Sequence, residues 1–121
     1  MKKILSSLAA LAVLAGCAAP QNKYDWGNYE QSLYEYYKAP ANAQALLLSL
    51  NTTITNAEAN KRTVAPGLYA EYGFLLMQSG KPKEAIVYFE KEKNKWPESA
   101  ALMNRMVAVA AAKPATAEVA Q

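Results

Sequence analysis

Apolar side chains recur at helical spacing along most of the chain after residue 23. The segment from Tyr24 to Lys38 carries one such stripe at steps of three, four and three residues: Trp26, Tyr29, Leu33 and Tyr36. This spacing places large side chains on one face of a helix and leaves Glu30 and Glu35 away from that face. We therefore predict a first helix that packs through its aromatic residues.

Prolines, glycines and capping residues divide the following residues into further helices. Pro40 ends the first segment, and Asn42 can cap a second helix that fades into polar residues around Asn60. The apolar side of this second helix consists of Ala43, Leu46, Leu47, Leu50 and Ile54. Pro66 suits the first turn of a third helix, which we expect to end at Gly80. Its large apolar residues are Tyr69, Tyr72, Leu76 and Met77.

Two more helices complete the pattern. Pro82 opens a fourth helix with a partly basic end, and Trp96-Pro97 stops it. Its apolar residues are Ala85, Ile86 and Phe89. Ser99 can cap a fifth helix, whose apolar face consists of Leu102, Met103, Met106, Val107 and Ala110.

Strand patterns are missing from the sequence. No segment shows the sustained two-residue alternation between turns that a half-buried strand requires. We therefore predict an all-α domain of about five helices over residues 24–112. Pro114 and the small, polar residues around it predict a disordered tail over residues 113–121.

The third and fourth predicted helices resemble one tetratricopeptide repeat. This repeat places large residues, a glycine, an alanine, an aromatic residue and a proline at fixed offsets within about 34 residues. The corresponding positions hold Tyr69, Tyr72, Gly73, Leu76, Ala85, Phe89 and Pro97. The resemblance implies that Gly73 and Ala85 lie where two helices cross closely, with larger side chains beside them.

The match to the repeat is incomplete. Four positions depart from the usual residues: Tyr69, Tyr72, Leu76 and Glu92. An unrelated helical hairpin therefore remains an alternative. A weaker copy can begin at Tyr29, but its glycine is missing and extra residues precede Pro66. Because about three repeats are usually needed for independent stability, an unfilled apolar groove or a partner interface is expected.

The N-terminus has the layout of a signal peptide. Lys2 and Lys3 precede an apolar stretch from Ile4 to Ala15, which small residues follow. Twelve residues form only about 18 Å of helix, well short of the hydrocarbon core of about 30 Å. We therefore expect residues 1–16 to be removed, which lowers the formal net charge from +3 to +1.

The segment Leu14-Ala15-Gly16-Cys17 resembles the lipobox of bacterial lipoproteins. The resemblance implies cleavage between Gly16 and Cys17, and a diacylglycerol and an N-acyl chain on Cys17. Two or three acyl chains anchor a protein durably to a bilayer. Residues 17–23 would then consist of the lipidated cysteine and a short linker. Because Ala18 stands where an aspartate would favour the inner membrane, the resemblance implies the outer membrane, facing the periplasm. The alternative is that Cys17 is a buried residue of a retained anchor helix.

The whole chain after Cys17 resembles a family of small bacterial lipoproteins of unknown function. The segments YDWGNYEQSLYEYYK and GKPKEAIVYFEKEKNKWPES carry the resemblance. Members of this family tend to be encoded beside a CsgG-like lipoprotein and another small lipoprotein, which implies an envelope assembly.

Catalytic and metal-binding patterns are absent from the sequence. The chain has no histidine and one cysteine, and it lacks a glycine-rich phosphate loop, so we expect no enzyme activity, no metal and no cofactor beyond the lipid. Its small charge excess gives no indication of nucleic acid binding. The residues Lys91, Lys93 and Lys95 alternate with Glu90, Glu92 and Asn94, as on a solvated helix face, with anionic lipid headgroups as an alternative partner.

Tyr34 and Tyr37 are the candidate partner surface, because they lie off the main aromatic stripe. The alternative is that most of the aromatic cluster only packs the core. We expect a membrane-anchored adaptor for another envelope protein, with a CsgG-like lipoprotein as the partner that the family resemblance implies. A self-associating scaffold and a module that binds a small ligand such as a peptidoglycan fragment remain alternatives.

Overall fold

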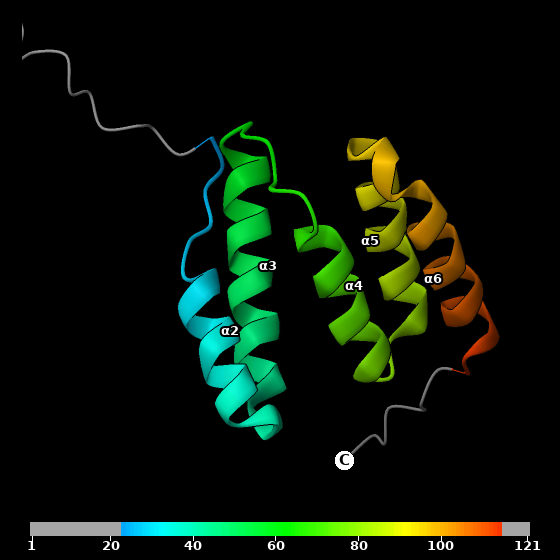
Figure 1. Ribbon diagram of the computed structural model, residues 1–121, viewed down its shortest axis with the longest axis horizontal. Coiled ribbons are helices and arrows are strands. Elements are labelled where there is room, and N and C mark those ends of the chain that lie inside the picture. The colour runs from blue at the N-terminus through cyan, green and yellow to red at the C-terminus, as the bar shows by residue number, and fades with distance from the viewer. Residues whose placement is uncertain (1–22, 115–121) are drawn as a thin grey trace, which may run out of the picture.

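A computed structural model of the protein describes residues 23–114, which form a row of five α-helices (Figure 1). The helices are α2 (Tyr29–Lys38), α3 (Ala43–Ala59), α4 (Leu68–Gln78), α5 (Pro82–Lys95) and α6 (Ala100–Ala112). Short 3₁₀ turns, Pro40–Asn42 and Pro97–Ser99, precede α3 and α6. Residues 23–114 contain no strand, and the predicted all-α fold with about five helices is confirmed.

Each helix packs antiparallel beside the next in chain order (Figure 1). Gly80 takes a φ of +82° in the turn between α4 and α5, where a residue with a side chain would be strained. Pro82 then stands in the first turn of α5, where its missing N–H has no helical acceptor to lose. The predicted signal segment with Gly16 and Cys17, and most of the predicted tail, lie outside the described residues.

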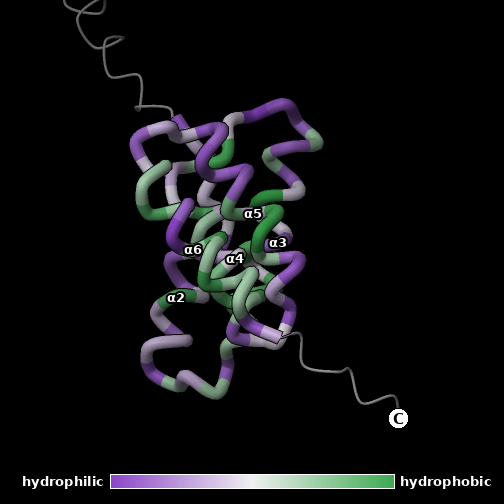
Figure 2. The backbone as a smooth tube through the Cα atoms, turned by 90° about the vertical axis from the view of Figure 1, so that its right-hand side faces the viewer, coloured by the Kyte–Doolittle hydropathy of each residue, from purple (hydrophilic) through white to green (hydrophobic). Residues whose placement is uncertain are grey.

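One hydrophobic core runs between the helices. Figure 2 shows the hydrophobic stretches gathered around the middle of the helices. The largest fully buried side chains are Leu46, Leu50, Leu68, Leu76, Pro82 and Phe89. Partly buried aromatic residues of the N-terminal part, including Tyr29 and Tyr36, pack against this core. No helix within residues 23–114 combines the length and the apolar content needed to cross a membrane.

The helices α4 and α5 approach each other closely at Gly73. A Cβ added to Gly73 would lie 2.8 Å from Phe89 Cε1 and 3.1 Å from the Ala85 carbonyl oxygen. The absence of a side chain at Gly73 therefore permits the two helices to approach. Six of the residues assigned to the repeat are buried: Tyr69, Tyr72, Gly73, Leu76, Ala85 and Phe89. The seventh, Pro97, is exposed and begins the 3₁₀ turn before α6.

The first helix begins later than its apolar pattern predicts. It starts at Tyr29 rather than Tyr24, because Gly27 adopts a φ of +50° that a right-handed helix cannot contain. Trp26 therefore precedes the helix and is 37% exposed. Asn42 and Ser99 occupy the N-cap positions of α3 and α6, but among the described residues their side chains form no capping bond.

Two residues on the later helices differ from the sequence prediction. Leu102 is 59% exposed, because α6 ends the described row of helices and packs against α5 through a narrow stripe that includes Met103 and Ala110. Glu92, which the charge pattern placed on a solvated face, is only 2% exposed. Its Oε1 accepts a hydrogen bond from the Gly67 backbone N–H at 2.8 Å. Glu92 is therefore buried because its carboxylate contacts the start of α4.

Candidate functional site

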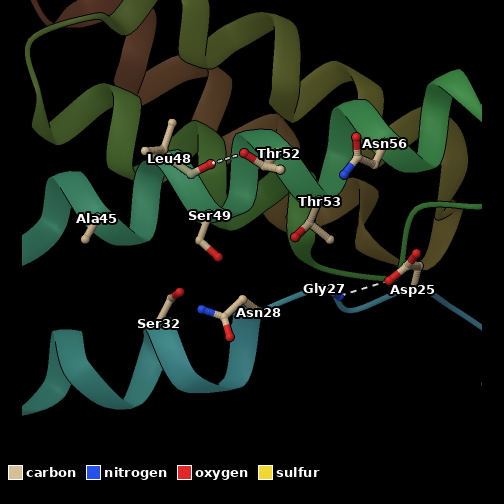
Figure 3. A pocket seen from close by; sticks show the side chains of 10 residues that line it. All are labelled: Asp25, Gly27, Asn28, Ser32, Ala45, Leu48, Ser49, Thr52, Thr53 and Asn56. Carbon is tan, nitrogen blue, oxygen red and sulfur yellow. Dashed lines mark hydrogen bonds between the residues drawn. The ribbon is translucent and has the colours of Figure 1, made fainter.

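A groove of about 440 Å³ lies between α2 and α3 at one end of the helical row (Figure 3). Six of its ten lining residues carry a hydroxyl or an amide, although carbon atoms form most of its accessible surface. The lining residues are Asp25, Gly27, Asn28, Ser32, Ala45, Leu48, Ser49, Thr52, Thr53 and Asn56. We call this surface the α2–α3 groove.

The α3 wall of the groove follows from helical spacing. Ser49, Thr52 and Asn56 recur at steps of three and four residues, so they share one face of α3. Leu50 and Ile54 lie on another face and are buried in the core. A single helix thus separates the apolar core from a polar surface.

The segment before α2 lies on the other side of the groove and is held against α3 by close contacts. A Cβ on Gly27 would lie 2.6 Å from Thr53 Oγ1, so only glycine permits this approach of backbone to α3. The Gly27 N–H donates to Asp25 Oδ1 at 3.0 Å. Asp25 Oδ2 pairs with Arg62 Nη1 at 3.2 Å. These contacts fix Asn28 at the mouth of the groove.

The groove offers hydrogen-bonding groups with little free charge. Figure 3 shows Asn28, the residue before α2, and Ser32 of α2 facing Ser49 of α3. The Ser49 Oγ is inaccessible to solvent, and no hydrogen-bond partner for it is found within residues 23–114. Asp25 is the only ionisable residue in the lining, and its carboxylate is engaged by Arg62. The groove therefore suits a neutral ligand with hydroxyl or amide groups.

A second hollow, of about 460 Å³, adjoins the groove at Trp26. It is lined by Trp26, Gly27, Asn28, Glu30 and Gln31, and thus shares two residues with the groove. The Trp26 ring lies between two tyrosines, with ring centroids 6.3 Å from Tyr24 and 5.8 Å from Tyr29. These contacts hold a partly exposed indole beside the polar groups of Asn28 and Gln31.

The predicted partner surface lies on α2. Tyr34 is 57% exposed and Tyr37 is 74% exposed, whereas Tyr29 and Tyr36 of the same helix are half-buried against the core. The Lys38 ammonium lies 5.2 Å from the centre of the Tyr34 ring. The two tyrosines thus present an aromatic surface outside the packed stripe, next to one cation.

Tyr29 connects α2 to α4. Its hydroxyl donates to Glu71 Oε2 at 2.5 Å, across 42 residues of sequence. Burial, together with the bond to Glu71, raises the pKa of Tyr29 above its ordinary range. This contact fixes the rotation of α2 and with it the direction of the exposed tyrosines.

The basic residues at the end of α5 are engaged within the fold. Lys91 Nζ pairs with Glu58 Oε1 at 2.9 Å and lies 5.5 Å from the Tyr69 ring centre. Lys93 Nζ pairs with Glu90 Oε2 at 2.6 Å. The predicted solvated face is therefore only partly free, because two of its three lysines are tied to acidic neighbours.

Groups of side chains that could hold a metal ion are not found within residues 23–114. Of the acidic pair at the end of α5, Glu90 bonds to Lys93 and Glu92 bonds to the Gly67 backbone. The groove and the exposed aromatic surface are the two candidate binding surfaces of the described residues.

The sequence pattern did not predict the groove, although the polar residues of one side of it follow a readable pattern. The polar spacing of Ser49, Thr52 and Asn56 is readable along one predicted helix. The opposite wall, from Asn28 and Ser32, requires knowledge of how α2 packs on α3. The sequence of α2 indicates its aromatic stripe and the two tyrosines beside it, but not which residues Ser32 faces.

Comparisons with known proteins identify the family of the chain. No curated protein and no solved structure matches it at a significant level. A family model described as Domain of unknown function (DUF4810) matches residues 23–106. The matched stretch includes the α2–α3 groove, both exposed tyrosines and the α4–α5 hairpin. The match covers more than two thirds of the chain, and the protein therefore belongs to this family of unknown function.

Proposed function

We propose that the protein is a membrane-anchored bacterial lipoprotein that acts as a non-enzymatic adaptor for another envelope protein. The anchor is Cys17, which carries diacylglycerol and an N-acyl chain after cleavage of residues 1–16. The lipobox and the charged, apolar and small-residue order before it support this assignment. Ala18 favours the outer membrane, with the helical domain facing the periplasm.

The anchor has a direct test. Cells that express the protein are labelled with radioactive palmitate, and membranes are separated from soluble proteins. The natural chain incorporates the label and sediments with outer membranes. Cys17→Ser removes both properties, whereas Ser7→Ala, a control change in the signal segment, retains them. Label on the Cys17→Ser chain would contradict the assignment.

The exposure of Tyr34 and Tyr37 is the observation that supports the adaptor role best. Tyrosine supplies a large contact area with a polar end, and such residues are enriched at protein interfaces. Both stand on α2, whose rotation is fixed by the bond between Tyr29 and Glu71. A preformed aromatic surface of this kind suits a protein partner.

The relation to tetratricopeptide repeats adds to this proposal. Gly73 of α4 lies against the Phe89 ring and the Ala85 carbonyl oxygen of α5, which supports the close crossing that the repeat resemblance implies. Repeat arrays of this kind bind other proteins through surfaces formed by successive helices. The protein would then be a short, incomplete repeat array with a binding surface on α2.

The partner that we propose is a CsgG-like lipoprotein, on the basis of the family resemblance. A photoreactive benzoylphenylalanine replaces Tyr34 or Tyr37 in the lipidated protein in its native envelope. Val87 on α5, which is 53% exposed, provides the control position. We expect light to link the CsgG-like lipoprotein at 34 and 37 but not at 87. Equal capture at all three positions, or no capture of that protein, would reject the proposal.

A self-associating scaffold is the second candidate function. Leu102 and Val109 project from the outer side of α6 with 59% and 53% exposure, and their spacing of seven places them on one face. A second copy could cover this stripe. Sedimentation of the purified protein separates the two proposals: Leu102→Lys would reduce a dimer to a monomer in the scaffold case and leave an adaptor unchanged.

A further inference from the structure

The α2–α3 groove and the neighbouring indole have no part in the adaptor surface. We infer that together they bind a neutral saccharide. The inference goes beyond the adaptor role, because it uses Trp26 and the groove residues instead of Tyr34 and Tyr37. The supporting observations are the hydrogen-bonding groups of the groove, the position of Trp26 and the local charge.

The walls of the groove match the hydrogen-bonding pattern of sugar hydroxyls. Asn28 and Asn56 each offer an amide that can donate and accept. The Thr52 hydroxyl donates to the Leu48 carbonyl oxygen at 3.0 Å, so its oxygen remains as an acceptor for a ligand. Ser49 Oγ is buried with no hydrogen-bond partner in residues 23–114 and faces the α2 wall (Figure 3). Solvent does not reach this oxygen, so the hydrogen-bonding groups open to a ligand are those of the exposed residues Asn28, Thr52 and Asn56.

Trp26 supplies the apolar part of the site. Sugar rings carry a face of C–H groups and an edge of hydroxyls, so they require a flat apolar surface beside polar groups. The partly exposed Trp26 indole meets this requirement, because Asn28 and Gln31 line the same hollow. Its contacts with Tyr24 and Tyr29 fix the indole before the ligand arrives, which reduces the entropy lost on binding.

Charge favours a neutral ligand. The groove lining contains no basic residue, and its one carboxylate, that of Asp25, is already paired with Arg62. Glu30 lines the hollow beside Trp26 and would repel an acidic sugar. An anionic polysaccharide is therefore disfavoured at this surface.

A peptide fits the groove less well. Peptides bound in helix grooves gain most of their affinity from apolar anchors that enter apolar pockets. The α2–α3 groove has only Ala45 and Leu48 as apolar lining residues, and Leu48 is largely exposed. Six of the other eight lining residues carry a hydroxyl or an amide. A saccharide uses these groups more completely.

The experiment titrates the full-length lipidated protein, in a detergent without sugar headgroups, with tri-N-acetylchitotriose. Binding is followed by tryptophan fluorescence in a Trp96→Phe background, which leaves Trp26 as the reporter, and by calorimetry on the natural chain. We expect a saturable change in both signals. We expect none with tri-galacturonic acid, an acidic trisaccharide, or with a neutral peptide of serine and asparagine. Absence of saturation with the neutral trisaccharide, or stronger binding of the peptide, would overturn the inference.

Two variants on α3 form a matched pair that locates the binding site. Thr52→Val removes a hydroxyl from the groove lining, whereas Thr55→Val makes the same change on the same helix outside the lining. We expect Thr52→Val to weaken binding of the trisaccharide about three- to tenfold, as the loss of one hydrogen bond implies. Thr55→Val should leave binding unchanged. Equal effects of the two variants would place any bound sugar elsewhere and reject the site.

Discussion

The Glu92 carboxylate of α5 accepts a hydrogen bond from the backbone N–H of Gly67 at the start of α4, with Oε1 at 2.8 Å. The first N–H groups of a helix have no acceptors within the helix, and a carboxylate near them is stabilised by the helix dipole. Glu92 therefore caps α4 from the neighbouring helix. The contact joins residues 25 positions apart and ties the two helices of the hairpin at one end.

Removal of this carboxylate should destabilise the fold. Glu92→Ala leaves the Gly67 N–H without its acceptor and opens a small cavity, so we expect the free energy of unfolding to fall by about 1–3 kcal/mol. Urea unfolding followed by circular dichroism measures this change. Glu98→Ala, a substitution at an exposed acidic residue in the following turn, serves as the control and should be nearly neutral. Equal stability of Glu92→Ala and the natural chain would contradict the capping role.

The ionisation of Glu92 should make stability depend on pH. Burial outweighs the backbone hydrogen bonds and raises the pKa of Glu92 above its ordinary value of 4.5. A group whose pKa is raised by folding binds its proton more tightly in the folded state than in the unfolded state. Its contribution to the free energy of unfolding is therefore complete below pH 4.5 and declines as pH rises through the folded pKa. Glu92→Gln keeps an acceptor oxygen but does not titrate. We expect the natural chain to lose stability relative to this variant as pH rises above 4.5. A constant difference would contradict the raised pKa.

The helical order of this protein is readable from its sequence, because prolines, glycines and apolar spacing are local signals. The close crossing at Gly73 and Phe89 is also visible, since a repeat pattern links their positions. The charged sequence neighbours of Glu92 predict a solvated position, whereas its partner Gly67 stands at the start of another helix. Spacing along one helix predicts which residues share a face, but it does not identify what that face meets.

The same limit applies to the candidate site. Ser49 and Thr52 form a polar stripe that is readable in the sequence, whereas the opposing Ser32 lies on a helix whose sequence pattern identifies only its aromatic side. Gly27 interrupts the aromatic stripe and moves Trp26 out of the helix. A glycine within an otherwise helical pattern is therefore the sequence feature that indicates a non-helical segment before Tyr29.

Gly73 should tolerate no side chain unless Phe89 becomes smaller. Gly73→Ala places a Cβ 2.8 Å from Phe89 Cε1, so we expect a loss of about 1–3 kcal/mol in stability from overpacking. Phe89→Leu alone should also destabilise the core, since the Phe89 side chain is fully buried. In the double variant the smaller leucine relieves the clash, and the total loss should be less than the sum of the two single losses. Strict additivity in urea unfolding would indicate that the two residues do not interact.

The contact between Lys91 and Glu58 should contribute little to stability. Desolvation by burial acts to raise the pKa of Glu58, but hydrogen bonds from Lys91 and Tyr69 outweigh it and lower this pKa below its ordinary value. Both side chains of the ion pair remain partly exposed, so we expect Lys91→Gln to cost less than about 1 kcal/mol at neutral pH. A lowered pKa means that the contribution is present above pH 4.5 and is lost as pH falls through the folded pKa. Thermal unfolding at pH 7 and at pH 3 should therefore show a smaller effect of the variant at the lower pH.

Gly27 should be needed for both stability and the position of Trp26. Gly27→Ala forces a residue with a Cβ into a φ of +50° and brings that Cβ to 2.6 Å from Thr53 Oγ1. The backbone conformation alone costs about 1–2 kcal/mol for a residue other than glycine. We expect thermal unfolding at a lower temperature and a shift of the Trp26 emission towards that of a solvated indole, measured in the Trp96→Phe background. Adding Thr53→Ala removes the steric contact but not the strained φ, so it should restore part of the lost stability. Unchanged emission and stability in Gly27→Ala would mean that the segment before α2 is not held by its approach to α3.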